Sequence, residues 1–205
     1  MINISIYDKI NERGKRLRVI SGKSRGLKLN TPENMDIRPT TDRVKEAMFN
    51  IISPYIYGSN ILDLFAGSGA LGVEALSRGA ELCYFVDSSK TSMNVTKSNI
   101  KKARLEDGAV TINSSYEKAI DRILMNKVKF DVIFVDPPYY EGYFIDVIKK
   151  IDSTDILKDD GIIVVEHDVK TEIPEEIGRI YISKEKKYGK TMVTIMSKHT
   201  EGDDE

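Results

Sequence analysis

The 205-residue sequence predicts an α/β protein built on a mostly parallel sheet. From residue 60 onward, short apolar segments alternate with amphipathic ones, which is typical of a parallel sheet covered by helices on both faces. The apolar segments are too short for ordinary helices, and most are rich in β-branched residues. We therefore expect strands at 61–65, 82–86, 110–112, 130–135 and 162–165, and helices at 70–78, 90–103, 116–125 and 143–151.

Both ends of the chain depart from this alternation. Residues 179–183 and 192–197 read as two strands joined by the polar segment 184–190, which predicts an antiparallel hairpin at one sheet edge. Near the start, residues 18–21 and 27–29 read as two short strands around a glycine-containing turn. A helix is expected over 43–52, with Thr41 or Asp42 as its N-cap.

Composition places the chain among ordinary globular proteins, with 40% hydrophobic and 31% charged residues. Its longest apolar stretches are far shorter than the roughly 20 residues that span a bilayer. The single cysteine, Cys83, cannot form an internal disulfide and is expected to pack as a small hydrophobe. The first ten residues lack the pattern of a secretory leader, so we expect a cytoplasmic protein.

The net charge of −1 hides an uneven distribution of basic residues. Seven basic side chains and no acidic one fall within residues 13–28, namely Arg13, Lys15, Arg16, Arg18, Lys23, Arg25 and Lys28. Such an arm suits contacts with nucleic-acid phosphates, although a solvated basic hairpin explains the charges equally well. The same two interpretations apply to Lys184, Lys186, Lys187 and Lys190 near the end of the chain.

A glycine-rich segment follows the first expected strand of the core. Gly67, Gly69 and Gly72 match the spacing G-x-G-x-x-G, which lets the backbone approach a ligand at the start of a helix. Asp87 stands 20 residues after Gly67, at the end of the second expected strand, where a carboxylate can bind a pair of ribose hydroxyls. Both NAD and S-adenosylmethionine carry such a ribose, and a tight turn without any ligand is the structural alternative.

Two features favour S-adenosylmethionine over NAD. Asp63 precedes the loop, where its carboxylate could hold a cationic amino-acid group, either directly or by ordering the loop. The segment Asp136-Pro137-Pro138-Tyr139 follows the expected strand 130–135 and offers a surface for a flat base instead of a hydride-transfer site. A turn cap is the structural alternative for Asp136, but capping requires neither two prolines nor an aromatic residue.

The same four residues suit methylation of an exocyclic amine on a nucleobase. Such an amine is a poor nucleophile because its lone pair is delocalised into the ring. Asp136 and the Pro137 carbonyl could accept hydrogen bonds from its two hydrogens, and Asp136 could also take the proton. Tyr139 could stack on the base, and orientation of the two reactants would supply much of the rate. No metal is needed for this chemistry.

These residues resemble the RsmD-type family of class I S-adenosylmethionine-dependent methyltransferases, which methylates guanine N2 in small-subunit (16S) ribosomal RNA. The resemblance covers residues 18–197, and its most specific motifs are Arg18-Val19-Ile20-Ser21-Gly22, Arg25-Gly26, Arg38-Pro39-Thr40-Thr41-Asp42-Arg43-Val44-Lys45-Glu46, Phe49-Asn50, the loop 63–72, the tetrad 136–139 and Tyr188-Gly189-Lys190-Thr191. It implies a Rossmann-like fold with a seven-stranded, mostly parallel sheet, a C-terminal antiparallel hairpin and an N-terminal arm made of a β-hairpin and a helix.

The resemblance also implies roles for individual residues. The implied cofactor-binding residues are Asp63, Phe65, Ala66, Gly67, Ser68, Gly69, Asp87, Asn113, Ser114 and Ser115. The implied catalytic residues are Asp136, Pro137 and Tyr139, and the expected RNA-binding residues are Arg18, Lys23, Arg25, Lys28, Arg38 and Arg43. The expected partner is ribosomal RNA, either free or within a small subunit or its assembly intermediate, with no membrane or metal involved.

By this resemblance the chain divides into a leader at 1–16, a basic arm and helix at 17–53, a methyltransferase core at 54–198 and an acidic tail at 199–205. The family usually starts near Leu17, so residues 1–16 are a departure, and one hypothesis is an over-long gene start. Other functions stay open. They are a DNA adenine or cytosine N-methyltransferase, a non-catalytic RNA-binding assembly factor and, third, an NAD(P) oxidoreductase.

Overall fold

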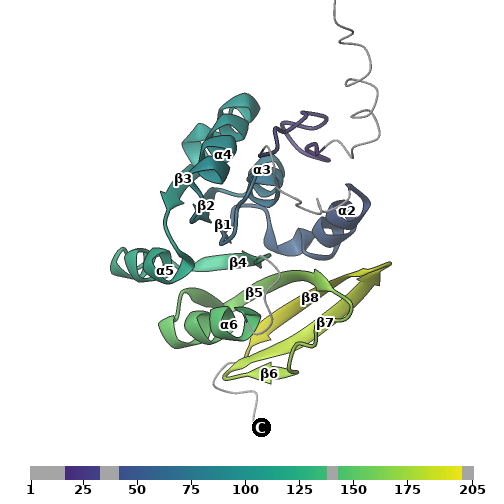
Figure 1. The fold of residues 1–205 in the computed structure, drawn as a ribbon, viewed down its shortest axis with the longest axis vertical. Helices are drawn as coiled ribbons and strands as arrows, with labels where there is room; N and C mark the ends of the chain where they lie inside the picture. Colours follow the sequence, from purple (N-terminus) through teal and green to yellow (C-terminus); the bar gives the residue numbers. More distant parts are fainter. Residues whose placement is uncertain (1–16, 33–41, 138–142, 200–205) are drawn as a thin grey trace, which may run out of the picture.

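The computed structural model describes residues 17–32, 42–137 and 143–199. An eight-stranded sheet runs through the molecule in the order β3-β2-β1-β4-β5-β8-β7-β6, with helices packed on both of its faces (Figure 1). The strands are β1 (Asn60–Asp63), β2 (Leu82–Asp87), β3 (Ala109–Asn113), β4 (Phe130–Val135), β5 (Leu157–Asp168), β6 (Glu176–Ile177), β7 (Ile180–Tyr188) and β8 (Thr191–Lys198).

The pairing confirms a mostly parallel sheet with a C-terminal hairpin. Strands β3, β2, β1, β4 and β5 pair in parallel, whereas β8 is antiparallel to β5 and β7 is antiparallel to β8. The chain moves outward from β1 to β3 and then returns to place β4 on the other side of β1. Open α/β sheets bind their ligands where the strand order reverses in this way, outside the carboxyl ends of the strands.

In the described residues, the helices that cover the two faces of the sheet are α2 (Asp42–Ile51), α3 (Ala70–Ser77), α4 (Lys90–Ala103), α5 (Tyr116–Met125) and α6 (Tyr143–Thr154). Short 3₁₀ turns lie at Ser53–Tyr55 (η2) and Glu106–Gly108 (η3). Alternate residues of each strand point to opposite faces, which produces two apolar clusters. The first cluster lies under α2, α3 and α4 and contains Phe49, Cys83 and Phe134, and the second lies under α5 and α6 and contains Ile120 and Ile133.

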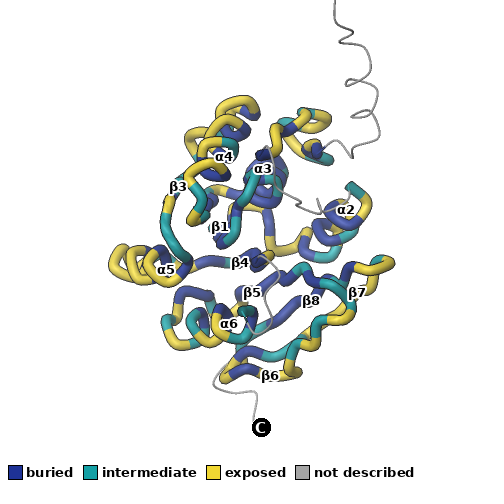
Figure 2. The backbone as a smooth tube through the Cα atoms, viewed as in Figure 1, coloured by how far each residue is buried: buried dark blue, intermediate teal, exposed yellow. Residues whose placement is uncertain are grey.

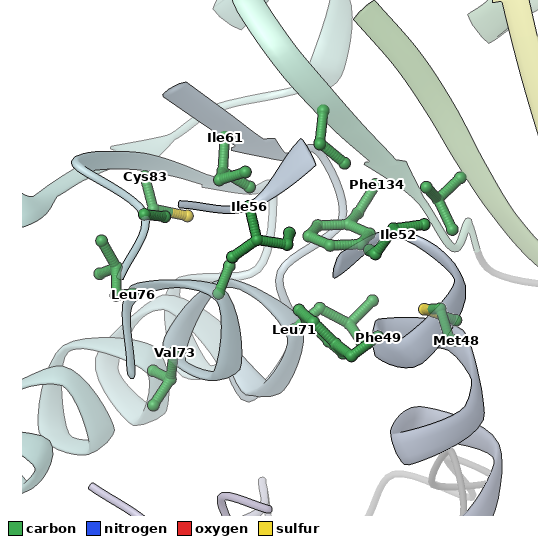
Figure 3. Close-up of a cluster of buried hydrophobic side chains, with 14 of the residues drawn as sticks. Met48, Phe49, Ile52, Ile56, Ile61, Leu71, Val73, Leu76, Cys83 and Phe134 are labelled. Atoms are coloured by element: carbon green, nitrogen blue, oxygen red, sulfur yellow. The ribbon is translucent and has the colours of Figure 1, made fainter. Parts of the chain in front are cut away.

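Buried backbone runs continuously through the central strands, while the outer faces of α4 and α5 are exposed (Figure 2). Figure 3 shows the first cluster, in which Phe49 and Ile52 lie against Phe134 and Cys83 lies beside α3. The rings of Phe49 and Phe134 have their centroids 5.7 Å apart. Full burial of Cys83 confirms its role as a small core residue. No helix within residues 17–32, 42–137 and 143–199 has the length and apolar character to cross a membrane.

The C-terminal hairpin is longer than the sequence predicts. Strand β7 continues through the polar residues 184–187 to Tyr188, which pairs with Thr191, so the loop contains only Gly189 and Lys190. These residues look like a loop in the sequence because a strand near the sheet edge leaves its side chains in solvent. The two-residue strand β6, which pairs with Ile180 and Tyr181, makes the sheet eight-stranded instead of seven-stranded.

The N-terminal hairpin has fewer paired residues than the two predicted strands would have. One antiparallel bridge joins Arg18 to Lys28, supported by hydrogen bonds from Val19 N to Leu27 O (2.9 Å) and from Leu29 N to Leu17 O (2.8 Å). The following helix starts at Asp42, one residue before the predicted start. Thr41, the other N-cap candidate, lies outside the described residues, as do the leader 1–16 and most of the acidic tail.

Candidate cofactor and substrate site

The glycine loop lies at the carboxyl end of β1 and leads into α3. Gly69 is the N-cap of α3 with φ of +77°, a left-handed conformation that L side chains rarely adopt. A Cβ added there would lie 2.9 Å from the Cγ2 atom of Thr96, so both the backbone and the packing require glycine. The loop is therefore held close to α4, with the first free N–H groups of α3 at the same edge.

Asp63 is buried at the end of β1, with 3% of its surface exposed. Its Oδ2 atom accepts a hydrogen bond from Gly72 N at 3.0 Å, which fixes the first turn of α3. Burial raises the pKa of the Asp63 carboxyl to about 7. Repulsion from Asp87 also raises this pKa, whereas the hydrogen bond from Gly72 lowers it. This geometry supports ordering of the loop, which is one of the two roles that the sequence allows.

Asp87 connects the loop to the start of α4. Its Oδ2 atom accepts from Gly67 N at 2.8 Å and its Oδ1 atom accepts from Ser89 N at 2.7 Å. A carboxylate oxygen has two lone pairs, so each oxygen retains one acceptor site for a ligand. The structure thus brings Asp63, Asp87 and the loop together at neighbouring strand ends, because Asp63 pairs with Phe85 in the β1–β2 register.

The remaining cofactor residues implied by the resemblance lie around this centre. Asn113 donates from Nδ2 to the carbonyls of Asp87 (2.7 Å) and Ser88 (3.1 Å), and Ser114 N donates to the Asp87 carbonyl at 3.1 Å. Ser115 is the N-cap residue of α5. The segment 113–115 therefore borders Asp87, and its role in binding the cofactor stays a prediction.

Phe65 and Ala66 form the first part of the loop. Ala66 is buried, and its N–H donates to the Val86 carbonyl at 2.8 Å. The Phe65 ring lies 5.9 Å from the ring of Tyr116 and 5.8 Å from that of Tyr143. These two tyrosines, from α5 and α6, border the loop on the side of the second cluster.

Asp136 follows the last residue of β4. Side chains of a strand alternate between its two faces, so Asp136 points to the same face as Phe134. This is also the face of Asp63 and α3. Desolvation raises the pKa of Asp136 well above its usual value, and repulsion from Glu166 and Asp63 adds to the effect. The residue is nevertheless exposed, so the carboxyl group has many protein atoms around it and yet remains reachable from solvent.

Pro137 is buried beside Asp136, whereas Pro138 and Tyr139 lie outside the described residues. Four carboxyl groups lie at or near the carboxyl ends of the neighbouring strands β2, β1, β4 and β5, namely those of Asp87, Asp63, Asp136 and Glu166. Across the described parts of the chain, no group of three or more His, Cys, Asp or Glu side chains is arranged to hold a metal ion. This edge presents oxygen acceptors and backbone N–H groups, which are suited to a nucleoside with a cationic substituent.

Two buried polar residues on α4 also hold the loop, and the sequence-based interpretation missed both. Thr96 donates from Oγ1 to Gly67 O at 3.0 Å, and Asn99 donates from Nδ2 to Ser68 O at 2.8 Å. Asn99 also bonds the arm, accepting from Asn30 N at 2.8 Å and donating to Asn30 O at 2.9 Å. A usable signal existed, because Thr96 and Asn99 fall on the helical stripe that contains the buried residues Met93 and Ile100.

A buried ion pair attaches the arm to α3. Glu74 accepts from the backbone N–H groups of Ile20 (2.7 Å) and Ser21 (3.0 Å), and its Oε2 atom lies 3.3 Å from Lys45 Nζ. Lys45 also donates to the Arg18 carbonyl at 2.5 Å. Burial lowers the pKa of Lys45, while the Glu74 carboxylate opposes that change.

The structure separates the residues expected to bind RNA. Lys23 N donates to Ser77 O at 2.8 Å and Ser24 Oγ donates to Ala103 O at 2.9 Å, so the arm's turn lies at the C-terminal ends of α3 and α4. Eight helical residues, about 12 Å, separate that end of α3 from the glycine loop. Exposed Lys23 and Arg25 therefore lie at the other end of α3 from the glycine loop.

The other expected RNA contacts are exposed or lie outside the described residues. Arg18 is exposed and forms an ion pair with Asp42, with Nε 2.7 Å from Oδ2. Lys28 and Arg43 are exposed, and Arg38 is not among the described residues. The RNA-binding role of these residues stays a prediction.

His167 lies on the opposite face of the sheet from Asp136. Its Nε2 atom is 2.8 Å from Thr194 Oγ1, its Nδ1 atom is 3.1 Å from the Asp168 carbonyl, and its ring meets that of Phe144 edge-on at 6.0 Å. The Thr194 hydroxyl in turn donates to Glu185 Oε1 at 3.0 Å. These contacts give His167 a structural position.

Comparisons with known proteins place this chain among methyltransferases. YlbH of Bacillus subtilis (strain 168), provisionally named an rRNA methyltransferase, is 43% identical over 182 residues that cover 89% of this chain and 99% of that protein. Ribosomal RNA small subunit methyltransferase D of Escherichia coli (strain K12) is 31% identical over 188 residues, covering 92% and 93%. A solved structure from Escherichia coli, provisionally named methyltransferase yhhF, is 30% identical with a TM-score of 0.78, covering 91% of this chain and 99% of that one.

The family model described as conserved hypothetical protein 95 matches residues 17–197, which is nearly the whole described structure. Its match begins where the arm begins and ends within β8. The match and the relatives agree with the sheet order and with the loop at the carboxyl end of β1. The chain therefore belongs to the conserved hypothetical protein 95 family, the RsmD-type family of Rossmann-like methyltransferases.

Proposed function

We propose that the protein methylates the exocyclic N2 amine of a guanine in small-subunit ribosomal RNA with S-adenosylmethionine as the methyl donor. The observation that carries the proposal is the position of Asp136, which is reachable from solvent, close to Asp63 and on the face of the sheet that holds the glycine loop. The names of the relatives support ribosomal RNA as the substrate class, and the resemblance of the motifs supports guanine N2.

The residues at the loop fit S-adenosylmethionine. Buried Asp63 has a raised pKa and would gain from a cation nearby, which the amino group and the sulfonium of this cofactor supply. Asp87 retains acceptor sites for ribose hydroxyls after it bonds Gly67 and Ser89. When bound, the cofactor supplies an electrophilic methyl group.

Asp136 and the carbonyl of Pro137 would accept hydrogen bonds from the two hydrogens of the target amine. This contact would hold the nitrogen in one orientation and localise its lone pair, so that the reacting atoms meet in line. A carboxylate whose pKa is raised binds a proton more strongly, so Asp136 also suits the role of acceptor for the amine proton. Tyr139 would complete the surface under the base.

The test is methyl transfer from labelled S-adenosylmethionine to unmodified small subunits, naked small-subunit RNA and DNA, followed by nucleoside mapping. We expect label in N2-methylguanosine from one of the two RNA substrates. Asp136→Asn should reduce the rate at least a hundredfold, which is within the range for loss of a proton acceptor, while S-adenosylhomocysteine still binds.

Asp160→Asn is the matched control, because Asp160 is an exposed aspartate away from the loop and this variant should keep wild-type activity. Label in adenine or cytosine of DNA would replace the proposal with the DNA methyltransferase alternative. An Asp136→Asn enzyme within tenfold of wild type would remove the proposed role of Asp136.

A further inference from the structure

The lysines of β7 divide between the two faces of the sheet. Residues directly opposite each other in an antiparallel pair share a face. Lys184 pairs with Ile195 and Lys186 pairs with Val193, and both partners belong to the first apolar cluster, under α2, α3 and α4. Lys187 pairs with Met192 and therefore points to the other face.

Side-chain contacts support this assignment independently of the register. Tyr188, two residues after Lys186, packs against the first cluster. Glu185, between the two lysines, accepts a hydrogen bond from Thr194 Oγ1 at 3.0 Å, and Thr194 is bonded to His167 on the other face. Lys184 and Lys186 therefore share the face of Asp136.

The register also gives the distance between Lys186 and the proposed reaction site. Val135 pairs with Val165, which places Asp136 beside Glu166, and Glu166 pairs with Val193, which pairs with Lys186. Three strand spacings separate Asp136 from Lys186, or about 14 Å. The tip of the β7–β8 hairpin extends past the end of β4, on the side where β4 ends (Figure 1).

These lysines present positive charge to solvent. Lys184, Lys186 and Lys187 are exposed, and among the described residues none of them forms an ion pair. By contrast, four other lysines form ion pairs with aspartates, namely Lys129, Lys150, Lys158 and Lys198. Lysines near a sheet edge also prevent that edge from pairing with a strand of another chain. This protection does not depend on which face of the sheet the lysines occupy, whereas phosphate binding does.

We propose that Lys184 and Lys186 bind phosphates of the RNA strand whose target base lies at Asp136. The inference rests on the proposed function and extends it by naming a phosphate-binding surface at the carboxyl edge of the sheet. The turn of the N-terminal arm, with Lys23 and Arg25, lies at the C-terminal ends of α3 and α4, away from the glycine loop at the start of α3.

Lys186→Gln and Lys187→Gln form a matched pair, because the two residues are adjacent and exposed but point to opposite faces of the sheet. We expect Lys186→Gln to raise the KM for small-subunit RNA without changing kcat at saturating RNA, and Lys187→Gln to leave both unchanged. The double variant Lys184→Gln/Lys186→Gln should reduce the slope of log binding constant against log salt by about 1.4 for single-stranded RNA. Across a fourfold rise in salt, wild type should then lose about sevenfold more affinity than the double variant.

The outcomes separate this inference from the function on which it rests. Equal RNA affinity and salt slope for Lys186→Gln and Lys187→Gln, in a protein that methylates RNA, would overturn the inference and leave protection of the edge as the explanation of these lysines. A wild-type protein that neither binds nor methylates small-subunit RNA would overturn the proposed function and the inference together. Loss of affinity in Lys23→Gln/Arg25→Gln alone would move the phosphate contacts to the arm.

Discussion

Replacing Asp63 by asparagine should remove the pH dependence of S-adenosylhomocysteine binding. In the free protein the pKa of Asp63 is about 7, so half of the molecules carry a neutral carboxyl near neutral pH. A bound α-amino cation favours the ionised form and should lower that pKa, which releases a proton on binding. Affinity must then rise with pH until Asp63 is ionised in the free protein as well.

The magnitude follows from linkage between the two titrations. If binding lowers the pKa of Asp63 to about 4 or below, affinity should increase about 25-fold between about pH 5.5 and about pH 7.5. At about pH 6, binding should release roughly 0.9 proton. The ligand's amino group stays largely protonated in this range, so its own titration adds little.

Isothermal titration calorimetry in two buffers of different ionisation enthalpy measures both the affinity and the proton release. Asp63→Asn should bind with a nearly flat pH profile and without proton release, while Asp160→Asn should behave like wild type. A wild-type affinity that is constant over this range, with no proton released, would refute the assignment of Asp63 as a buried carboxyl that responds to the cofactor.

Two further predictions concern stability. Gly22→Ala should lower the free energy of unfolding by more than about 2 kcal/mol, because a Cβ at this φ of +83° would lie 1.8 Å from Ser77 O. Gly26→Ala, at φ of +82° with no atom within 4 Å, should cost only about 1 kcal/mol, and equal losses in urea titrations would contradict the proposed contact. Burial lowers the pKa of His167, so the unfolded state binds more protons and stability should fall as pH drops below about 6.5. Chemical denaturation of His167→Gln should show a smaller loss of stability between about pH 7 and about pH 5, and an unchanged pH profile would count against this.

The sequence was sufficient to predict the parallel sheet, because buried strands require short apolar runs that helices cannot use. It also located Asp87 and Asp136 at strand ends, since each follows such a run directly. Asp63 was expected inside a strand over 61–65, but β1 ends at this residue. The extent of β7 could not be predicted, because residues 184–187 gain their strand conformation from pairing with β8 and not from apolar side chains.

The buried polar residues were harder to foresee. Lys45 and Glu74 read as surface charges, yet each lies in an apolar stripe of its helix and is fully buried. Their burial depends on the backbone N–H groups of Ile20 and Ser21, which come from a segment about 50 residues earlier in the chain than Glu74. A local pattern cannot indicate such a partner.

The side-chain amide of Asn99 has a consequence for dissecting this enzyme. Both of its N–H groups and its oxygen are engaged, with the hairpin strand on one side and the turn before α3 on the other. A truncated protein starting after residue 53 would leave Asn99 and Glu74 without these partners and would uncover the apolar side of α3. Deletion of the N-terminal segment would therefore change the folding of the protein as well as its affinity for substrate. Point substitutions at the surface of this segment measure its contribution to RNA binding without that effect.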